Sequence, residues 1–279
     1  MVSVDKARYH VHANGNMWER ALWDYLFGGG SIERVHQCLL CYKNPDGGWG
    51  HGLEHDLRAP QSNPLMLEFL LTVVRDTGIP VGDILDGSPE WVEHVQNEDG
   101  LLAPPPGLLD HPHAPWWEQM ETGAPDSITG NLTKLGLCPP AVQERTMRWV
   151  QANLGLERIR TNEWLFMAYH AFDYYMNETD FPNVEVYRAA VLENIYACAL
   201  AHEKKGEPNK LFPIFQFANG PDSLVAQEAP TGLIDRILDH LQATQREDGG
   251  WDDEHGLAYW QPYFSTVVLL ALKRFGRVA

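Results

Sequence analysis

The segment Asn44-Pro45-Asp46-Gly47-Gly48-Trp49-Gly50 is the most informative for the fold, because its Asp-Gly-Gly-Trp core recurs near the other end of the chain. The second copy runs Glu247-Asp248-Gly249-Gly250-Trp251, and a shorter relative, Gln96-Asn97-Glu98-Asp99-Gly100, keeps the turn without the tryptophan. Turn glycines repeat at intervals of roughly fifty residues, with two predicted helices in each interval, which is typical of stacked helical hairpins. These glycines are Gly47, Gly100, Gly155, Gly206 and Gly249.

Apolar residues at helical spacing indicate that the chain between the turns is helical. The predicted helices cover residues 18–27, 32–42, 65–74, 89–95, 127–137, 141–153, 162–176, 184–203, 231–245 and 263–275. No run alternates with period two, so we expect no substantial sheet. One hairpin cannot bury its apolar face alone, so five or six of them should curl with apolar inner helices inside polar outer ones. We therefore predict an all-α protein with a single domain over residues 1–279.

A proline-rich stretch interrupts this pattern between residues 101 and 125. Pro104, Pro112 and Pro115 rule out a long helix there, because proline lacks an N–H and clashes with the preceding turn. Long irregular loops in compact proteins are often lids over a site. We predict that this stretch is irregular and serves as a lid, with Trp117 as a ligand contact.

The repeated unit resembles that of the squalene/terpenoid cyclase and protein prenyltransferase superfamily. Gln245 to Trp251 matches its Gln–Trp (QW) motif, and Lys43 to Trp49 matches with Lys in the Gln place. The resemblance implies an α/α toroid, a single ring of hairpins whose inner helices line a central cavity. The chain looks most like small bacterial repeat proteins of this superfamily, whose activity the resemblance does not supply.

The chain departs from the enzymes of that superfamily at their catalytic motifs. The Asp-x-Asp-Asp acid of the cyclases is missing, and Asp252-Asp253 is the nearest approach to it. The Asp, Cys and His zinc ligands of the prenyltransferases have no counterpart that spacing identifies. We therefore predict no metal site, and the cofactor, if there is one, stays unknown.

Composition narrows the partners that the protein can have. Lys and Arg number 21 against 38 Asp and Glu, which gives a formal net charge of −17. Such an acidic surface disfavours nucleic acids and anionic membranes. No apolar run reaches membrane-spanning length, the start does not have the pattern of a signal peptide, and four scattered cysteines fit a reducing compartment. We expect a cytoplasmic protein with a small-molecule ligand and no membrane span, in an oligomeric state that the sequence does not indicate.

The loop after the first turn holds the densest group of functional side chains. Its formal His-x-x-Glu-His match, residues 51–55, lies among glycines, whereas that zinc motif works only on a helix. Glu54 and Asp56 are instead candidates for catalytic acid or base, and His51, His55 and Arg58 for ligand contacts. The alternative is structural: Asp56 and Arg58 form an ion pair that fixes the loop.

The second turn offers a similar set of groups. Asp252 and Asp253 are the catalytic candidates and His255 a ligand contact, and the alternative is a solvated pair at a helix start. If the ring closes, the two loops share one rim of the cavity. Aromatic side chains add further candidate ligand contacts, although most of them could equally belong to the core. These are Trp49, Tyr169, Trp251, Trp260 and Tyr263.

Three functions fit these observations. The first is a cyclase- or transferase-like protein that binds an isoprenoid-like molecule in its cavity, with acid/base catalysis by loop carboxylates. The second is a carbohydrate-active enzyme of α/α barrel type, a glycosidase or lyase, which would need paired carboxylates and tryptophan platforms. The third is a non-catalytic binding or scaffold protein whose centre is filled by side chains.

Overall fold

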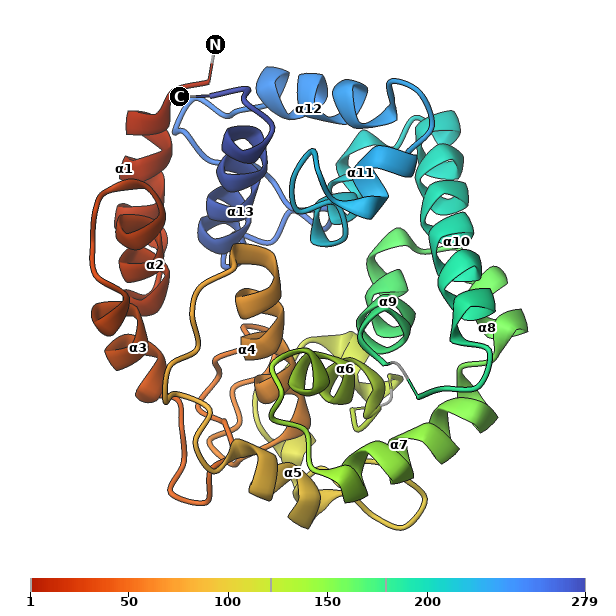
Figure 1. Ribbon diagram of the computed structural model, residues 1–279. Helices are drawn as coiled ribbons and strands as arrows, with labels where there is room; N and C mark the ends of the chain where they lie inside the picture. Colours follow the sequence, from red (N-terminus) through yellow and green to blue (C-terminus); the bar gives the residue numbers. More distant parts are fainter. Residues whose placement is uncertain (1, 121, 179, 279) are drawn as a thin grey trace. The chain divides into compact units, whose positions relative to one another are not determined.

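The computed structural model describes residues 2–120, 122–178 and 180–278, and every regular element in these ranges is a helix (Figure 1). Extended pairing within them is limited to isolated bridges, so the all-α class is confirmed, while the toroid stays a prediction. No helix in these ranges has both the length and the apolar character that crossing a bilayer requires.

The α-helices are α1 (Val4–Asn14), α2 (Met17–Phe27), α3 (Ile32–Leu40), α4 (Pro64–Thr77), α5 (Ser88–Val95), α6 (Asp126–Lys134), α7 (Pro140–Asn153), α8 (Leu156–Arg160), α9 (Ala168–Asn177), α10 (Val184–Lys205), α11 (Leu224–Glu228), α12 (Leu233–Ala243) and α13 (Gln261–Arg274). The 3-10 helices are η1 (Leu108–Asp110), η2 (Pro115–Glu118), η3 (Leu165–Met167), η4 (Pro208–Lys210) and η5 (Phe212–Gln216).

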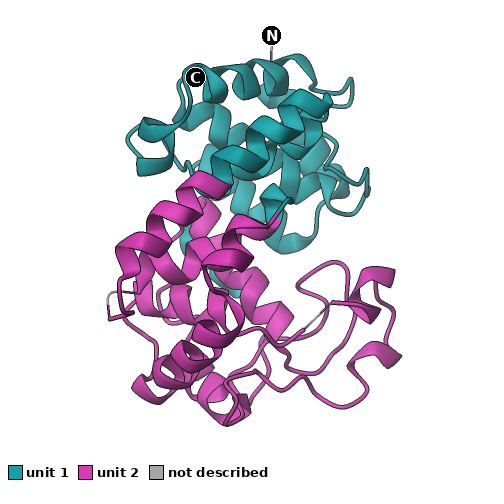
Figure 2. Cartoon of the chain, turned by 90° about the vertical axis from the view of Figure 1, so that its right-hand side faces the viewer, with its two compact units in different colours: residues 1–38, 163–166, 195–279 teal, residues 39–162, 167–194 magenta. Residues whose placement is uncertain are grey.

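The chain divides into two compact units (Figure 2). Unit 1 comprises residues 1–38, 163–166 and 195–279, and unit 2 comprises residues 39–162 and 167–194. Unit 1 contains α1, α2 and α11 to α13, and unit 2 contains α4 to α9; the boundaries fall within α3, η3 and α10. A single domain over residues 1–279 stays a prediction.

α4 covers the predicted helix at residues 65–74 and extends it by one residue at the start and three at the end. The Asn63 side chain accepts the N–H of Met66 at 3.3 Å, and Pro64 takes the first helical position. Gly78 ends the helix with a φ of +72°, a conformation that costs glycine little. Nearly all side chains of α4 are buried, which confirms the well-buried helix that its apolar sequence predicts.

α1 is an element that the polar start of the chain does not predict. Of its eleven residues, only Ala7, His10 and Val11 are buried, so its apolar pattern is too sparse to stand out. Ser3 caps the helix by accepting the N–H of Lys6 at 3.3 Å, and α1 packs against α2 and α13. Packing within unit 1 therefore stabilises a helix that its own sequence only weakly favours.

The three related turns have the same backbone geometry, and we call them the corners. Their central glycines, Gly47, Gly100 and Gly249, have φ of +90°, +90° and +94°, where residues with a Cβ are strained. In each corner the glycine N–H donates to the carbonyl three residues earlier, at 3.0 to 3.1 Å. A second backbone bond, at 2.8 to 2.9 Å, closes the turn over the next residue. The recurring turn is thus confirmed at three of the five predicted glycines. It is wrong for Gly155, which has a φ of −72° and precedes α8, and Gly206 ends α10 without the second bond of the corners.

Each corner also packs on the backbone of a neighbouring helix at a corresponding place. A Cβ added to any of the three glycines would collide with a backbone carbonyl there. The residues whose backbone they meet are Gly87 for the first corner, Arg145 for the second and Lys6 for the third. Four residues further along each neighbouring helix stand Trp91, Trp149 and His10, respectively. Each of these side chains lies against the central glycine of its corner or against the residue that follows it.

The tryptophans and glutamines of the motif hold the corners to the core. Trp49 is fully buried and donates through Nε1 to Ser88 Oγ at 3.0 Å, and Trp251 donates to the carbonyl of Leu241 at 2.7 Å. The amides of Gln96 and Gln245 each donate to the carbonyl of their corner glycine, at 2.8 and 2.9 Å. These contacts give the motif a structural role that requires no ligand.

Residues 101–125 are irregular, as the prolines predict, apart from η1 and η2 in the described part; residue 121 lies outside the described residues. Leu102 donates to the carbonyl of Gly123 at 2.8 Å and closes the base of the stretch. Further along, Arg58 N–H donates to Pro112 at 2.9 Å and Ala114 N–H donates to Asp56 at 2.7 Å. The stretch is therefore anchored twice within unit 2, and its role as a lid stays a prediction.

A buried carboxyl group stands in the first turn of α2 in unit 1. Glu19 is 1% exposed, and its Oε2 accepts the N–H of Asn16 at 2.5 Å to complete a capping box. Burial raises the pKa of Glu19 to about 8, although hydrogen bonds from Asn16 and Tyr263 oppose the shift. The carboxyl group therefore keeps its proton at neutral pH.

Glu19→Gln should weaken the pH dependence of stability. Because Glu19 titrates near 4.5 when unfolded and near 8 when folded, the unfolded state binds fewer protons between these pH values. The free energy of unfolding should then fall by up to about 1.4 kcal/mol per pH unit as the pH rises across this window, and glutamine removes this contribution. Urea unfolding at pH 5 and pH 8 should give a smaller difference for the variant; equal differences would contradict the burial argument.

Candidate functional site

The loop of the first corner places its candidate residues in different surroundings. Glu54 and His55 are buried, at 7% and 4% exposed, whereas His51 and Arg58 are exposed and Asp56 is half-buried. Glu54 Oε2 accepts the N–H of Asp56 at 2.9 Å. Burial, followed by the charge of Asp56, raises the pKa of Glu54 well above its ordinary value. These bonds fix the loop, so a catalytic role for Glu54 or Asp56 stays a prediction.

His51 and His55 do not face a common point in this loop. His51 has a φ of +60° and bonds through Nε2 to Asn44 Oδ1 at 2.9 Å. His55 instead packs edge-on against Phe69 of α4, with ring centres 6.0 Å apart. Among the described residues, no group of three or more His, Cys, Asp and Glu side chains is placed to hold a metal ion.

In the loop of the last corner, the candidate carboxylates accept hydrogen bonds from residues of the loop and from the start of α13. Asp252 Oδ1 accepts from Arg246 at 2.6 Å and from Gln261 at 2.8 Å. Asp253 accepts the backbone N–H groups of Leu257 at 2.6 Å and His255 at 3.3 Å. Burial raises the pKa of Asp253. This geometry favours the structural alternative for both aspartates, and their catalytic role stays a prediction.

Most of the candidate aromatic side chains are buried or half-buried. Trp251 and Tyr263 are buried in unit 1, where Tyr263 packs on Trp18 with ring centres 5.7 Å apart. Trp260 and Trp117 are half-buried. Tyr169 differs from them, because it belongs to a group of charged side chains in unit 2.

That group joins three helices of unit 2, and we call it the α4–α6–α9 cluster. α6 packs along both α4 and α9 (Figure 1). All members except Tyr169 are charged or titratable near neutral pH, and they come from helix interiors or helix starts rather than loops. The members are Glu68, Arg75 and Asp76 from α4, Asp126 from α6, and Tyr169, His170 and Asp173 from α9.

Arg75 and Asp173 form the buried base of the cluster. Their side chains are 4% and 1% exposed, and Arg75 Nη1 lies 2.6 Å from Asp173 Oδ2. The same oxygen accepts from Ser127 at 2.8 Å and Asn131 at 2.9 Å. A buried ion pair costs free energy unless hydrogen bonds of this kind complete it. The base therefore locks α4, α6 and α9 into one arrangement.

Asp126 and His170 form a second ion pair in the cluster. Asp126 is the first residue of α6, where the helix dipole favours a negative charge. Its Oδ1 lies 3.1 Å from His170 Nδ1, and the two side chains are 2% and 19% exposed. Burial alone lowers the pKa of His170, but Asp126, Glu68 and Asp173 outweigh it and raise the pKa to about 9. His170 is therefore an imidazolium at neutral pH.

Glu68 is the member of the cluster that titrates near neutral pH. Burial raises its pKa to about 7, and the charges of His170 and Arg75 oppose those of Asp126 and Asp173. Its Oε1 is buried and has no hydrogen-bond partner among the described residues, although the side chain as a whole is half-buried. A carboxyl group poised between its two forms at pH 7 suits proton transfer.

Tyr169 completes the cluster. Arg75 lies over its ring, with the guanidinium carbon 5.7 Å from the ring centre, and the ring stacks on His170 at 4.1 Å. Burial, followed by the charge of Glu68, raises the pKa of Tyr169 well above its ordinary value. The phenol therefore keeps its proton and can act as a hydrogen-bond donor.

Only Tyr169 of this cluster is among the residues that we predict from the sequence. Glu68 interrupts the apolar run of residues 65–74, and Asp173 stands between Phe172 and Tyr174. A charge inside an apolar helix costs free energy unless it is paired. That mismatch is the sequence signal that could have located both residues.

Comparison of the sequence with models of known protein families gives no match, and comparison with curated proteins gives none.

Proposed function

We propose that the α4–α6–α9 cluster is an acid–base catalytic centre in which Glu68 donates a proton to a neutral small molecule. The observation that carries the proposal is the Glu68 carboxyl group, which has a pKa of about 7 and an unpartnered Oε1 beside the His170–Asp126 pair. A proton donor is most effective when its pKa lies near the working pH. Glu54 and Asp253 differ from Glu68, because Oε2 of Glu54 and both oxygens of Asp253 accept backbone N–H groups of their own loops.

The neighbouring side chains have distinct tasks in this proposal. The His170 imidazolium lowers the pKa of Glu68 and opposes the effect of the surrounding carboxylates. Asp126 fixes the orientation of His170, and Arg75 holds the Tyr169 ring in place. Tyr169, which keeps its phenol proton, is the hydrogen-bond donor to the bound molecule in this proposal.

The charge of the cluster favours a substrate that becomes positive as it reacts. Asp76, Asp126 and Asp173 outnumber Arg75 and His170 by one, so the cluster is negative even with Glu68 protonated. When Glu68 gives up its proton, the excess of negative charge grows and stabilises a cation nearby. The same charge repels phosphate and diphosphate groups. The substrate should therefore be neutral.

The resemblance of the corners to the cyclase and prenyltransferase repeat points to an isoprenoid-like substrate. In the proposed step the O–H bond of Glu68 breaks and its proton adds to a carbon–carbon double bond, or to an epoxide oxygen whose bond to one ring carbon then breaks to leave a hydroxyl group. The product is a carbocation and the Glu68 carboxylate. Loss of a proton from a neighbouring carbon to that carboxylate then restores Glu68 and leaves a rearranged neutral product.

Turnover of matched isoprenoids tests this proposal. We expect the protein to convert a neutral compound from a panel of farnesol, geranylgeraniol, squalene and its epoxide, as followed by mass spectrometry of extracts. Farnesyl and geranylgeranyl diphosphate should react much more slowly, because the cluster repels them. Preferred turnover of a diphosphate, or of nitrophenyl glycosides in place of every isoprenoid, would contradict the proposal.

A further inference from the structure

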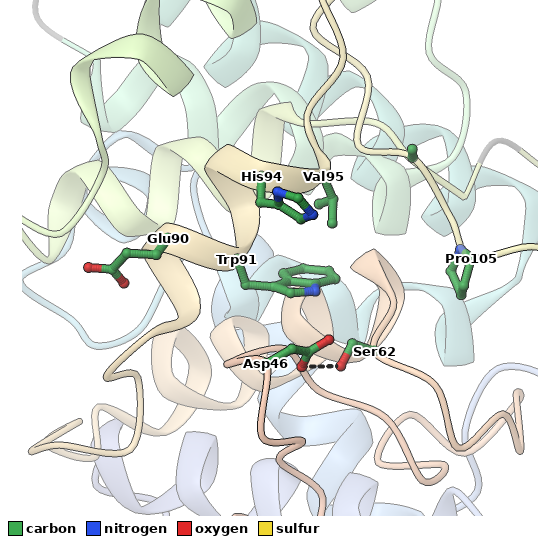
Figure 3. Close-up of a pocket in the computed structure, with 8 residues that line it drawn as sticks. Asp46, Ser62, Glu90, Trp91, His94, Val95 and Pro105 are labelled. Atoms are coloured by element: carbon green, nitrogen blue, oxygen red, sulfur yellow. Dashed lines mark hydrogen bonds between the residues drawn. The ribbon is translucent and has the colours of Figure 1, made fainter.

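A separate pocket lies in unit 2 beside the first corner. Its volume is about 410 Å³, in the range of small-molecule sites. Asp46 and Ser62 lie on one side of the Trp91 indole and His94 on the other, while Glu90 points away (Figure 3). Val95, Ala103 and Pro105 supply an apolar wall. The pocket thus combines an aromatic ring, an apolar side and one inward carboxylate.

The other two corners can be compared with this pocket position by position. Asp46, Asp99 and Asp248 stand at the same position of the three corners, one residue before the central glycine. The neighbouring helix places Trp91, Trp149 and His10, respectively, at the matching position. Because the backbone of the corners repeats, differences between them arise from side chains.

In the last corner, Arg246 compensates the charge of the aspartate and the buried His10 forms a hydrogen bond with it. Asp248 Oδ2 lies 3.2 Å from Nδ1 of His10 and 3.1 Å from Nη2 of Arg246. Asp46 instead accepts from the N–H of Gly48 at 3.0 Å and the hydroxyl of Ser62 at 2.7 Å. No ion pair to Asp46 is present in the described part of the chain, and no Lys or Arg lines the pocket. Burial lowers the pKa of His10, so Arg246 is the cationic partner of Asp248. The first corner therefore has a carboxylate without an ion pair where the last corner has an arginine.

We propose that this pocket binds a small organic ammonium ion that carries an apolar or aromatic arm. The ammonium group takes the place beside Asp46 that His10 and Arg246 occupy beside Asp248. The arm lies against Trp91 and the wall of Val95, Ala103 and Pro105, where cation–π and apolar contacts add to the ion pair. The proposal does not depend on the reaction at Glu68.

Calorimetric titration at low salt with three matched probes tests the proposal. 2-Phenylethylammonium should bind with a dissociation constant on the order of 1 mM, as expected of a ligand of this size. The neutral 2-phenylethanol should bind roughly fivefold more weakly and 3-phenylpropionate not measurably. Equal affinity for the amine and the alcohol, or no binding of the amine, would overturn the proposal.

Variants assign the binding to the pocket. Asp46→Asn keeps the acceptor oxygen for Gly48 and Ser62, so it should fold normally and lose roughly fivefold in affinity for the amine only. Asp99→Asn changes the equivalent exposed residue of the second corner and should leave affinity unchanged, as should Glu68→Gln. An unchanged affinity in Asp46→Asn, or equal losses in Asp46→Asn and Asp99→Asn, would overturn the assignment.

Discussion

Gly130→Ala should destabilise unit 2 by about 3 kcal/mol or more, because α6 and α9 touch at this glycine. A Cβ at position 130 would lie 2.8 Å from the Cα of Tyr174 and closer still to the carbonyl of Asp173. Neither backbone atom can move without separating the helices. Since Asp173 also anchors the base of the cluster, the change should disturb the ion pair with Arg75.

Thermal unfolding measures this effect directly. A loss of about 3 kcal/mol corresponds to a fall in Tm of roughly 6 to 12 °C for a protein of this size. Gly220→Ala is the matched control, because an added Cβ there meets nothing within 4 Å, and it should change stability by less than about 0.5 kcal/mol. Equal Tm values for the two variants would show that α6 and α9 are not in such close contact.

Glu68→Gln should lower the rate of the proposed reaction by about 10²- to 10⁴-fold, the usual contribution of a positioned proton donor. Glutamine has nearly the same shape and removes the transferable proton, so the fold should survive. In the wild type, the rate should fall as the pH rises above about 7, because Glu68 then loses its proton. The variant should have lost this part of the pH profile.

A control separates this effect from a general change in charge. Glu144 lies on α7 of the same unit, and its side chain is 77% exposed. Glu144→Gln makes the same substitution at the surface and should leave the rate and its pH profile unchanged. A Glu68→Gln enzyme with wild-type activity would remove Glu68 from the mechanism, whatever the effect of the control.

The corners are the part of the fold that the sequence predicts best, because their chemistry is local. Asp-Gly-Gly-Trp specifies a positive φ and a buried indole within a few residues, and Gly47 and Gly249 have that conformation. Asn63 and Pro64 likewise mark the start of α4. α1 was beyond such reasoning, since its stability depends on packing against α2 and α13 rather than on its own pattern.

The cluster could not be predicted from local sequence patterns either, because it depends on how separate helices pack. Glu68, Asp126 and His170 stand on three helices far apart in the chain, and no spacing rule connects them. Sequence motifs draw attention to loops such as the one that holds Glu54, whereas here the titrating carboxyl group lies on a helix. Charged residues within apolar helical runs were the better guide to the cluster.

In the mechanism proposed here, three helices of unit 2 hold the Glu68 carboxyl group near its titration midpoint at neutral pH. NMR titration of protein labelled with ¹³C at the glutamate side-chain carboxyl carbon measures this, with the Glu68 signal assigned by its loss in Glu68→Gln. We predict a midpoint near pH 7 for that signal. A midpoint near 4.5, the ordinary value for glutamate, would contradict the account.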